Sequence, residues 1–223
     1  EHISSIRLID ELAKVDQVLV GERHDNPDHH ALQLWLLQAL AQHRTQGSLL
    51  LEMLNPDQQD DVAQVQALIE RGEWPTDLAA ALDWQNRAEF MRVYRRIPTL
   101  TGAPADNEVQ RTLLEQIRIS HCDMLPETQL PAMLAVQQQR DQRMADQLDA
   151  APKPAMLLAG AFHVRRDLGV PLHLESHDGR VTTRVLILAE VEDVVRAGQA
   201  DFVWYTPAQP QQDHCAGLRK ATE

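Results

Sequence analysis

Acidic and imidazole side chains stand close together just after the first apolar segment of the chain. Glu22 and His24 are two residues apart in GERHDNPDHH, so both side chains point to one side if the backbone stays extended there. A carboxylate beside an imidazole suits general acid/base catalysis or metal binding. The alternative is structural: Asn26 caps a helix, and His29 and His30 are surface groups.

Similar residue types follow two other apolar segments. Glu52 comes directly after SLLL, and His163 and Arg165 follow AMLLAG. Each also has a structural explanation, as the exposed end of a strand or as a histidine packed in a turn. If they meet Glu22 and His24, the chemistry expected is that of a hydrolase: Glu22 or His24 activates water, Arg165 holds an anion and His163 supports charge.

A metal site is a second interpretation of the same residues. Glu22, His24 and His163 could bind a divalent metal from three separate loops. The sequence contains no HExxH and no CxxC, the two common zinc signatures. It also has no GxSxG and no P-loop, which argues against serine hydrolases of that type and against nucleotide hydrolysis.

The elements that must position these residues alternate between strand and helix. Short apolar segments at residues 15–20, 48–51 and 155–159 predict buried strands, and Asn26-Pro27 predicts the start of a helix between the first two. In an open parallel sheet, ligands bind beyond the carboxyl ends of the strands. The candidate residues follow three such strands, so we expect them at one edge of the sheet.

The rest of the chain predicts more helices and a late pair of strands. Asp178-Gly179 is a strong hairpin signal, so the flanking segments, 172–175 and 181–189, are expected to form an antiparallel pair. The fold class predicted is α/β, with a mixed, mainly parallel central sheet covered by helices. Further segments are predicted as follows: helices at 57–70, 77–82, 87–96, 108–119 and 127–150, a loop at 98–107 and a strand at 201–205. Residues 1–223 are expected to form one domain, with a mobile helical and loop region at about 98–126.

Polar residues in the helix predicted at 127–150 need an explanation. Gln137 and Asp141 fall on a stripe that is otherwise apolar, and an unpaired buried carboxylate is costly. Asp141 therefore either faces the crevice at the sheet edge or pairs with an arginine such as Arg140 or Arg165.

Composition excludes some classes of partner. The formal net charge is -12, which repels nucleic acid. No apolar run is long enough to span a bilayer. Cys122 and Cys215 are the two cysteines, so one disulfide can form in an oxidising compartment.

Several segments together resemble the ChaN family of bacterial haem-binding lipoproteins. The segments that carry the resemblance lie between residues 18 and 174: GERHDNPDHH, LLLEML, ALDW, QQQRDQRMA and AGAFHVRRDLGVPLHL. The opening motif is also similar, more distantly, to erythromycin esterase-like hydrolases and TIKI-type metalloproteases. The resemblance implies iron-regulated haem uptake, contact with outer-membrane uptake machinery and a haem-linked homodimer. It also implies the periplasmic side of the envelope, with a lipid anchor that this sequence does not show.

The family binds iron through a tyrosine, so the resemblance implies such a ligand here. Tyr94 is the first candidate, while Tyr205 has a strand pattern typical of the core. His121, beside Met124 in SHCDM, is an alternative iron ligand. Apolar cover for haem is expected from Leu113, Leu114, Ile117 and Met124. The leading hypothesis is therefore a non-enzymatic haem-binding protein whose haem site is separate from the strand-end residues, and the alternative is the hydrolase.

Overall fold

The strands of the central sheet follow the apolar segments of the sequence. They are β1 Gln17–Glu22, β2 Ser48–Leu51, β3 Ala155–Gly160, β4 Thr183–Glu190 and β5 Phe202–Thr206, in the order β2-β3-β1-β4-β5. β1 pairs in parallel with β3 and β4, and β4 pairs in parallel with β5. All of β1 is buried, as expected for a central strand covered on both faces. The computed structural model describes residues 1–54, 56–73, 81, 107–174, 181–210 and 215–216.

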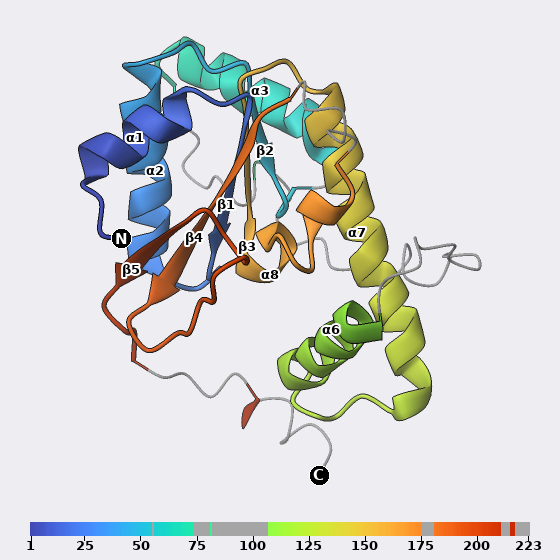
Figure 1. The fold of residues 1–223 in the computed structure, drawn as a ribbon. Helices are drawn as coiled ribbons and strands as arrows, with labels where there is room; N and C mark the ends of the chain where they lie inside the picture. The colour runs from blue at the N-terminus through green and yellow to red at the C-terminus, as the bar shows by residue number, and fades with distance from the viewer. Residues whose placement is uncertain (55, 74–80, 82–106, 175–180, 211–214, 217–223) are drawn as a thin grey trace. The chain divides into compact units, whose positions relative to one another are not determined.

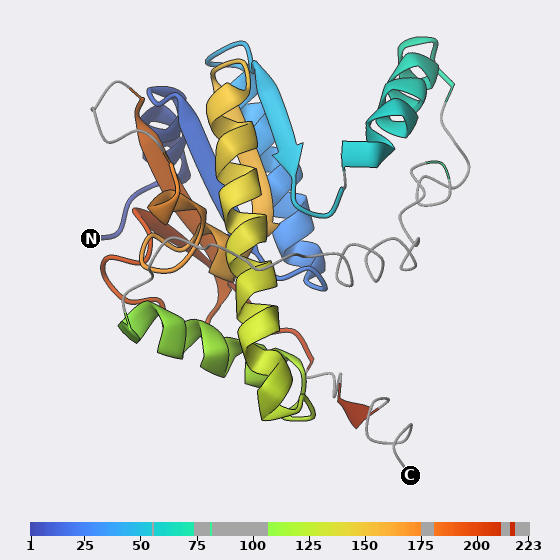
Figure 2. The same cartoon turned by 90° about the vertical axis from the view of Figure 1, so that its right-hand side faces the viewer.

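Helices cover both faces of this sheet. α1 and α2 lie on one side, and α7 and α8 lie on the other (Figures 1 and 2). The α-helices are α1 Ser5–Ala13, α2 Pro27–Ala41, α3 Gln59–Glu70, α6 Asn107–Ser120, α7 Leu130–Ala150 and α8 Ala161–Val164, and the 3-10 helices are η1 Pro56–Gln58, η2 Glu127–Gln129 and η3 Val170–Leu172. None of the helices in the described segments combines the length and apolar character that crossing a membrane requires.

The main core lies between the sheet and α7. Leu19 of β1 and Ile187 of β4 pack with Ala145 and Leu148 of α7, and all four are nearly inaccessible to solvent. Successive strand side chains alternate between the faces, so Val20 points to the α1 and α2 side, where it is also buried. Both faces of the central strands are therefore shielded from solvent.

A second, smaller core joins α6 to the first half of α7. Leu113 and Ile117 of α6 pack against Leu130 and Leu134 of α7, together with Leu168. The sequence prediction of helices at 108–119 and 127–150 is confirmed. The expectation that Leu113 and Ile117 cover haem is wrong, because their side chains are used to hold these helices together.

Residues 51–100 form a compact unit of their own, and residues 1–50 and 101–223 form the other. In the smaller unit, η1 and α3 follow β2 as predicted, and Gly72 ends the helix region with a positive φ of 77°. The helices predicted at 77–82 and 87–96 fall almost wholly outside the described residues, as does most of the loop predicted at 98–107. The prediction of one domain with a mobile region at about 98–126 stays a prediction; its described part begins with α6.

The late antiparallel hairpin is a wrong prediction. β4 runs parallel to both of its neighbours, and the segment expected to pair with it begins at Leu172, which is the last residue of the 3-10 helix η3. Asp178-Gly179, which suggested the turn, lies outside the described residues. A turn signal is local, whereas the strand partner is chosen by burial: β4 inserts beside β1, where both of its faces are covered.

Candidate functional site

The carboxyl end of β1 is built around a glycine that lets α8 lie directly on the sheet. A Cβ at Gly21 would stand 2.4 Å from Cγ2 of Val164 and 2.9 Å from Cα of Ala161. Glu22, the next residue, is in register with Gly160, the last residue of β3. The expectation that strand ends bring Glu22 and the segment after β3 to the same edge is confirmed.

Glu22 is buried and contacts two histidines, which together we call the Glu22 group (Glu22, His24, His30). Its side chain is 1% exposed, and Oε1 lies 2.5 Å from Nδ1 of His24. Oε2 lies 3.7 Å from Nε2 of His30 on α2. Both imidazoles are about half exposed. The histidines of the group therefore reach solvent, whereas the carboxylate that they contact is buried.

His163 belongs to a separate arrangement, the His163 group (His163, Asp141, Gln137). Its Nδ1 lies 2.5 Å from Oδ1 of Asp141 on α7, and both side chains are buried. The amide of Gln137 lies 3.1 Å from the same ring nitrogen. A carboxylate accepts hydrogen bonds and does not donate them, so His163 donates from Nδ1 to Asp141. The polar stripe on α7 is thus explained by a histidine from the strand edge, and this contact is not the arginine pairing considered from the sequence.

The two groups lie on opposite faces of the sheet. Gly21 faces α8 and the α7 side, and Glu22 therefore points to the α2 side, where His30 is found. His163 faces α7 through Asp141. Among the described residues, no group of three or more His, Cys, Asp or Glu side chains is arranged to hold a metal ion. A metal held jointly by Glu22, His24 and His163 therefore has no support in the described structure.

The positive charge of Arg165 is paired with the carboxylate of Asp167, two residues further along the chain. Its Nε and Nη2 donate to the two carboxylate oxygens of Asp167 at 2.9 and 2.6 Å. Burial opposes ionisation of Asp167, but the hydrogen bonds and charge of Arg165 hold the pKa of this carboxyl below its ordinary value. The guanidinium also lies 5.3 Å from the ring centre of Phe162. Both residues line a hollow of about 410 Å³ against α6.

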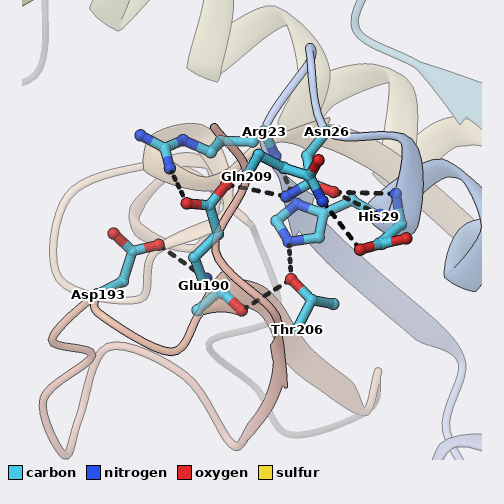
Figure 3. Close-up of polar contacts among 9 residues, drawn as sticks. Arg23, Asn26, His29, Glu190, Asp193, Thr206 and Gln209 are labelled. Atoms are coloured by element: carbon cyan, nitrogen blue, oxygen red, sulfur yellow. Dashed lines mark hydrogen bonds and ion pairs between the residues drawn. The ribbon is translucent and has the colours of Figure 1, made fainter. Parts of the chain in front are cut away.

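The sequence interpretation missed a third group, the Glu190 network (Arg23, Asn26, His29, Glu190, Thr206), at the same end of β4 and β5 (Figure 3). Glu190 Oε2 pairs with Arg23 at 2.7 Å, and Oε1 accepts a hydrogen bond from Asn26 at 2.9 Å. The signal was available, since Glu190 follows the apolar run LILA as Glu22 follows VLVG. The contacts of Glu190 with Arg23 and Asn26 connect the loop after β1 to the end of β4.

His29 is a buried structural histidine and not the surface group considered from the sequence. The backbone N–H of Arg23 donates to its Nδ1 at 3.0 Å, so its Nε2 donates to Thr206 Oγ1 at 3.1 Å. That hydroxyl in turn donates to the carbonyl of Ala189. Burial lowers the pKa of His29, although the nearby carboxylates of Glu22 and Glu190 oppose the shift. The ring is therefore held in one neutral tautomer.

Three other candidates are not members of these groups. Glu52 belongs to the unit of residues 51–100, and Tyr94 lies outside the described residues. Tyr205 is on β5 with 47% of its surface exposed, so the expectation that it packs in the core is wrong. It lies on β5, which is an edge strand of the sheet.

His121 directly follows α6 in a geometry that suits a metal ligand. Its Nδ1 lies 2.8 Å from the carbonyl oxygen of Ile117, which accepts and cannot donate. Nδ1 therefore carries the proton, and the neutral ring has its lone pair on Nε2. Metal-bound histidines commonly donate their other N–H to a backbone carbonyl in this way. Ile119 and Met124, on either side of His121, are exposed apolar residues at 59% and 38%.

The fold and these groups define an α/β protein with a parallel sheet and buried acid and imidazole groups at its carboxyl edge. The model of the family described as "Haem-binding uptake, Tiki superfamily, ChaN" matches residues 8–100 and 92–174. The chain therefore belongs to the ChaN family of haem-binding proteins, and the resemblance inferred from the sequence is confirmed.

A solved structure gives the same result. The structure titled "Cofacial heme binding to ChaN of Campylobacter jejuni" has a TM-score of 0.77 to this chain at 26% sequence identity. The alignment covers 91% of this chain and 92% of the other. A comparison with curated proteins found no match. The predicted α/β fold is confirmed, and haem is supported as the ligand of the family.

Proposed function

We propose that this protein binds haem for bacterial iron uptake, with His121 as an iron ligand and Tyr94 as the other candidate. The observation that carries the proposal is the hydrogen bond from Nδ1 of His121 to the Ile117 carbonyl. It fixes the ring and leaves Nε2 as the coordinating nitrogen. Membership of a haem-binding family supports the choice of ligand.

The surface beside His121 has the character that a porphyrin requires. Ile119 and Met124 expose apolar side chains, and Arg111 and Arg165 line the hollow along α6. Bound haem would supply an iron centre that the imidazole of His121 or the phenolate of Tyr94 would hold. The apolar residues would exclude water from its faces, and Arg111 would attract its carboxylates.

A homodimer linked by haem is part of the proposal. The similar Campylobacter jejuni protein is described as binding heme cofacially, and two haems face to face require two binding surfaces. In this chain the exposed Ile119 and Met124 would lie at such an interface. The mass of the protein measured by light scattering should double when haemin is added, and an unchanged mass at saturating haemin would count against the dimer.

The proposed location is the periplasmic side of the envelope, with haem passed to or from outer-membrane uptake machinery. Cys122 and Cys215 form a disulfide, as expected of proteins in oxidising compartments. Thiol-trapping reagents added to intact bacteria should find both cysteines oxidised. Two free thiols in the native host would contradict this location.

The test of haem binding is a haemin titration of the whole chain. The wild type should give a saturable, intense absorbance band. His121→Ala should shift or weaken it if imidazole is the ligand, and Tyr94→Phe should do so if phenolate is the ligand. Tyr205→Phe is the matched control because it removes the other tyrosine hydroxyl of the chain. No saturable band in the wild type would refute the proposed function.

A hydrolase is the second candidate, and the short contact between Glu22 and His24 favours it. Glu22 would hold His24 as the base that activates water, and His24 is exposed enough to meet a substrate. A screen of ester and peptide hydrolysis decides the matter when wild type is compared with Glu22→Gln. Turnover that disappears in this isosteric variant would support the hydrolase, and turnover that persists would exclude it.

A further inference from the structure

The hollow along α6 combines charged, polar and apolar side chains, and we call it the α6 hollow. Its volume is about 410 Å³. Ligand pockets commonly have volumes of about 300–1,000 Å³, so the α6 hollow is large enough for one edge of a porphyrin. The residues that matter here are Arg111, Glu115, Gln116 and Ile119 of α6, with Phe162 and Arg165 from α8 and its C-cap.

Most charged groups of the α6 hollow are paired within the protein. Arg165 donates two hydrogen bonds to the carboxylate of Asp167. Glu115 lies 3.7 Å from Arg118, which also donates to both carboxylate oxygens of Glu127. Opposite charges therefore offset each other around Arg165 and around Glu115.

Arg111 carries a charge that no such pairing offsets. Its side chain is exposed in the second turn of α6, and it forms no ion pair with any residue of the described segments. The N–H groups of its guanidinium are therefore available to a ligand. A guanidinium binds a carboxylate through two parallel hydrogen bonds. The side-chain amide of Gln116, in the same lining, can donate a further one.

The charge of the whole protein makes a local cation important for an anionic ligand. The formal net charge is -12, which opposes the approach of a porphyrin with ionised carboxylates. Exposed charges more than about 8 Å away are largely screened at physiological ionic strength, so Arg111 dominates the interaction once a carboxylate lies in the α6 hollow. Ile119, which is 59% exposed, and Phe162 offer apolar contact to the ring.

We infer that the α6 hollow is a subsite for a porphyrin carboxylate, and that Arg111 selects porphyrins with a free carboxylate whether or not they contain iron. This inference rests on the proposed function, because membership of the haem-binding family points to a porphyrin. It does not depend on which residue holds the iron. The protein should therefore also bind metal-free protoporphyrin.

The first experiment titrates metal-free protoporphyrin and its uncharged dimethyl ester into the whole chain, followed by porphyrin fluorescence. Arg111→Gln should bind the free acid about 5-fold more weakly than the wild type does, because one exposed charge pair is lost. Its affinity for the ester should stay within about 2-fold of the wild type. Arg143→Gln is the matched control, since it removes an exposed arginine of α7 that does not line the α6 hollow. This control should stay within about 2-fold for both porphyrins.

Three results of this experiment would overturn the inference. The first is an unchanged affinity of Arg111→Gln for the free acid. The second is an equal loss for the free acid and the ester, which would mean that the substitution acts on the fold and not on the carboxylate. The third is an equal loss for the free acid in Arg143→Gln, which would mean that only the net charge of the protein matters.

The second experiment repeats the titrations with haemin. Haemin has the same carboxylates, so Arg111→Gln should again bind about 5-fold more weakly than the wild type. A wild type that binds haemin but not metal-free protoporphyrin would overturn this inference and leave the proposed function standing. A wild type that gives no saturable haemin band would refute the proposed function itself, and the inference would fall with it.

Discussion

At the scale of single residues, Gly21 is a position where the packing of α8 on the sheet leaves no room for a side chain. Replacement by alanine puts a Cβ 2.4 Å from a methyl group of Val164, which is closer than atoms approach. Gly21→Ala should lower the free energy of unfolding by about 1–3 kcal/mol, measured by chemical denaturation.

The second variant for this test is Val164→Ala. It removes the clashing methyl group, so the double variant Gly21→Ala with Val164→Ala should be more stable than the sum of the single effects predicts. The rescue is partial because Cα of Ala161, at 2.9 Å, remains. Strict additivity would show that α8 does not press on Gly21.

His29 predicts a dependence of stability on pH. Burial lowers its pKa in the folded protein, whereas the unfolded chain keeps a value near 6.5. Between the two values the unfolded chain binds more protons, so the free energy of unfolding decreases as the pH falls through that interval. Above this pH interval, protonation of His29 no longer lowers the free energy of unfolding.

The variant that tests this dependence is His29→Gln. It should cost about 1–3 kcal/mol at pH 7.5, because buried hydrogen bonds to Arg23 and Thr206 are lost. The difference in free energy of unfolding between the wild type and His29→Gln should become smaller toward pH 5. His43→Gln, on a half-exposed histidine, is the control. A constant difference across this range would mean that His29 does not titrate as described.

At the scale of helices, the two described side-chain N-caps differ in what they support. Asn26 caps α2 by accepting from two backbone N–H groups, and its amide also donates to buried Glu190. Ser4 caps α1 and accepts one such bond. Asn26→Ala should therefore destabilise by about 2–4 kcal/mol, against about 1 kcal/mol for Ser4→Ala. Similar losses in thermal or chemical unfolding would show that the bond to Glu190 contributes nothing.

Local signals explain which elements could be predicted from the sequence. The strands β1, β2, β3 and β5 and the helix after Asn26-Pro27 were predictable because apolar runs and caps act within a few residues. The pairing of β4 was not, since it depends on which sheet position buries both of its faces. No helix was predicted for residues 5–13, where α1 packs on α2.

At the scale of the whole molecule, the sequence indicated the edge at which the candidate residues gather, but not the faces on which they lie. Glu22 and His163 were expected to meet because both follow strands. The contact of Gly21 with α8 puts Glu22 on the other face, and this contact joins residues far apart in the chain. The partner of His163 was indicated only as a polar stripe on α7. The resemblance to the ChaN family predicted haem as the ligand, whereas the strand-end residues alone did not predict it.

The disulfide has a consequence for stability. Closing a loop of roughly 90 residues restricts the unfolded chain, which contributes up to about 4.6 kcal/mol in the chain-entropy model. Denaturation with and without a reductant should show the reduced protein to be less stable by an amount approaching this value. Cys122→Ser with Cys215→Ser should lose the same contribution, because this double variant also opens the loop. Equal stability before and after reduction would mean that the C-terminal segment stays attached without the bond.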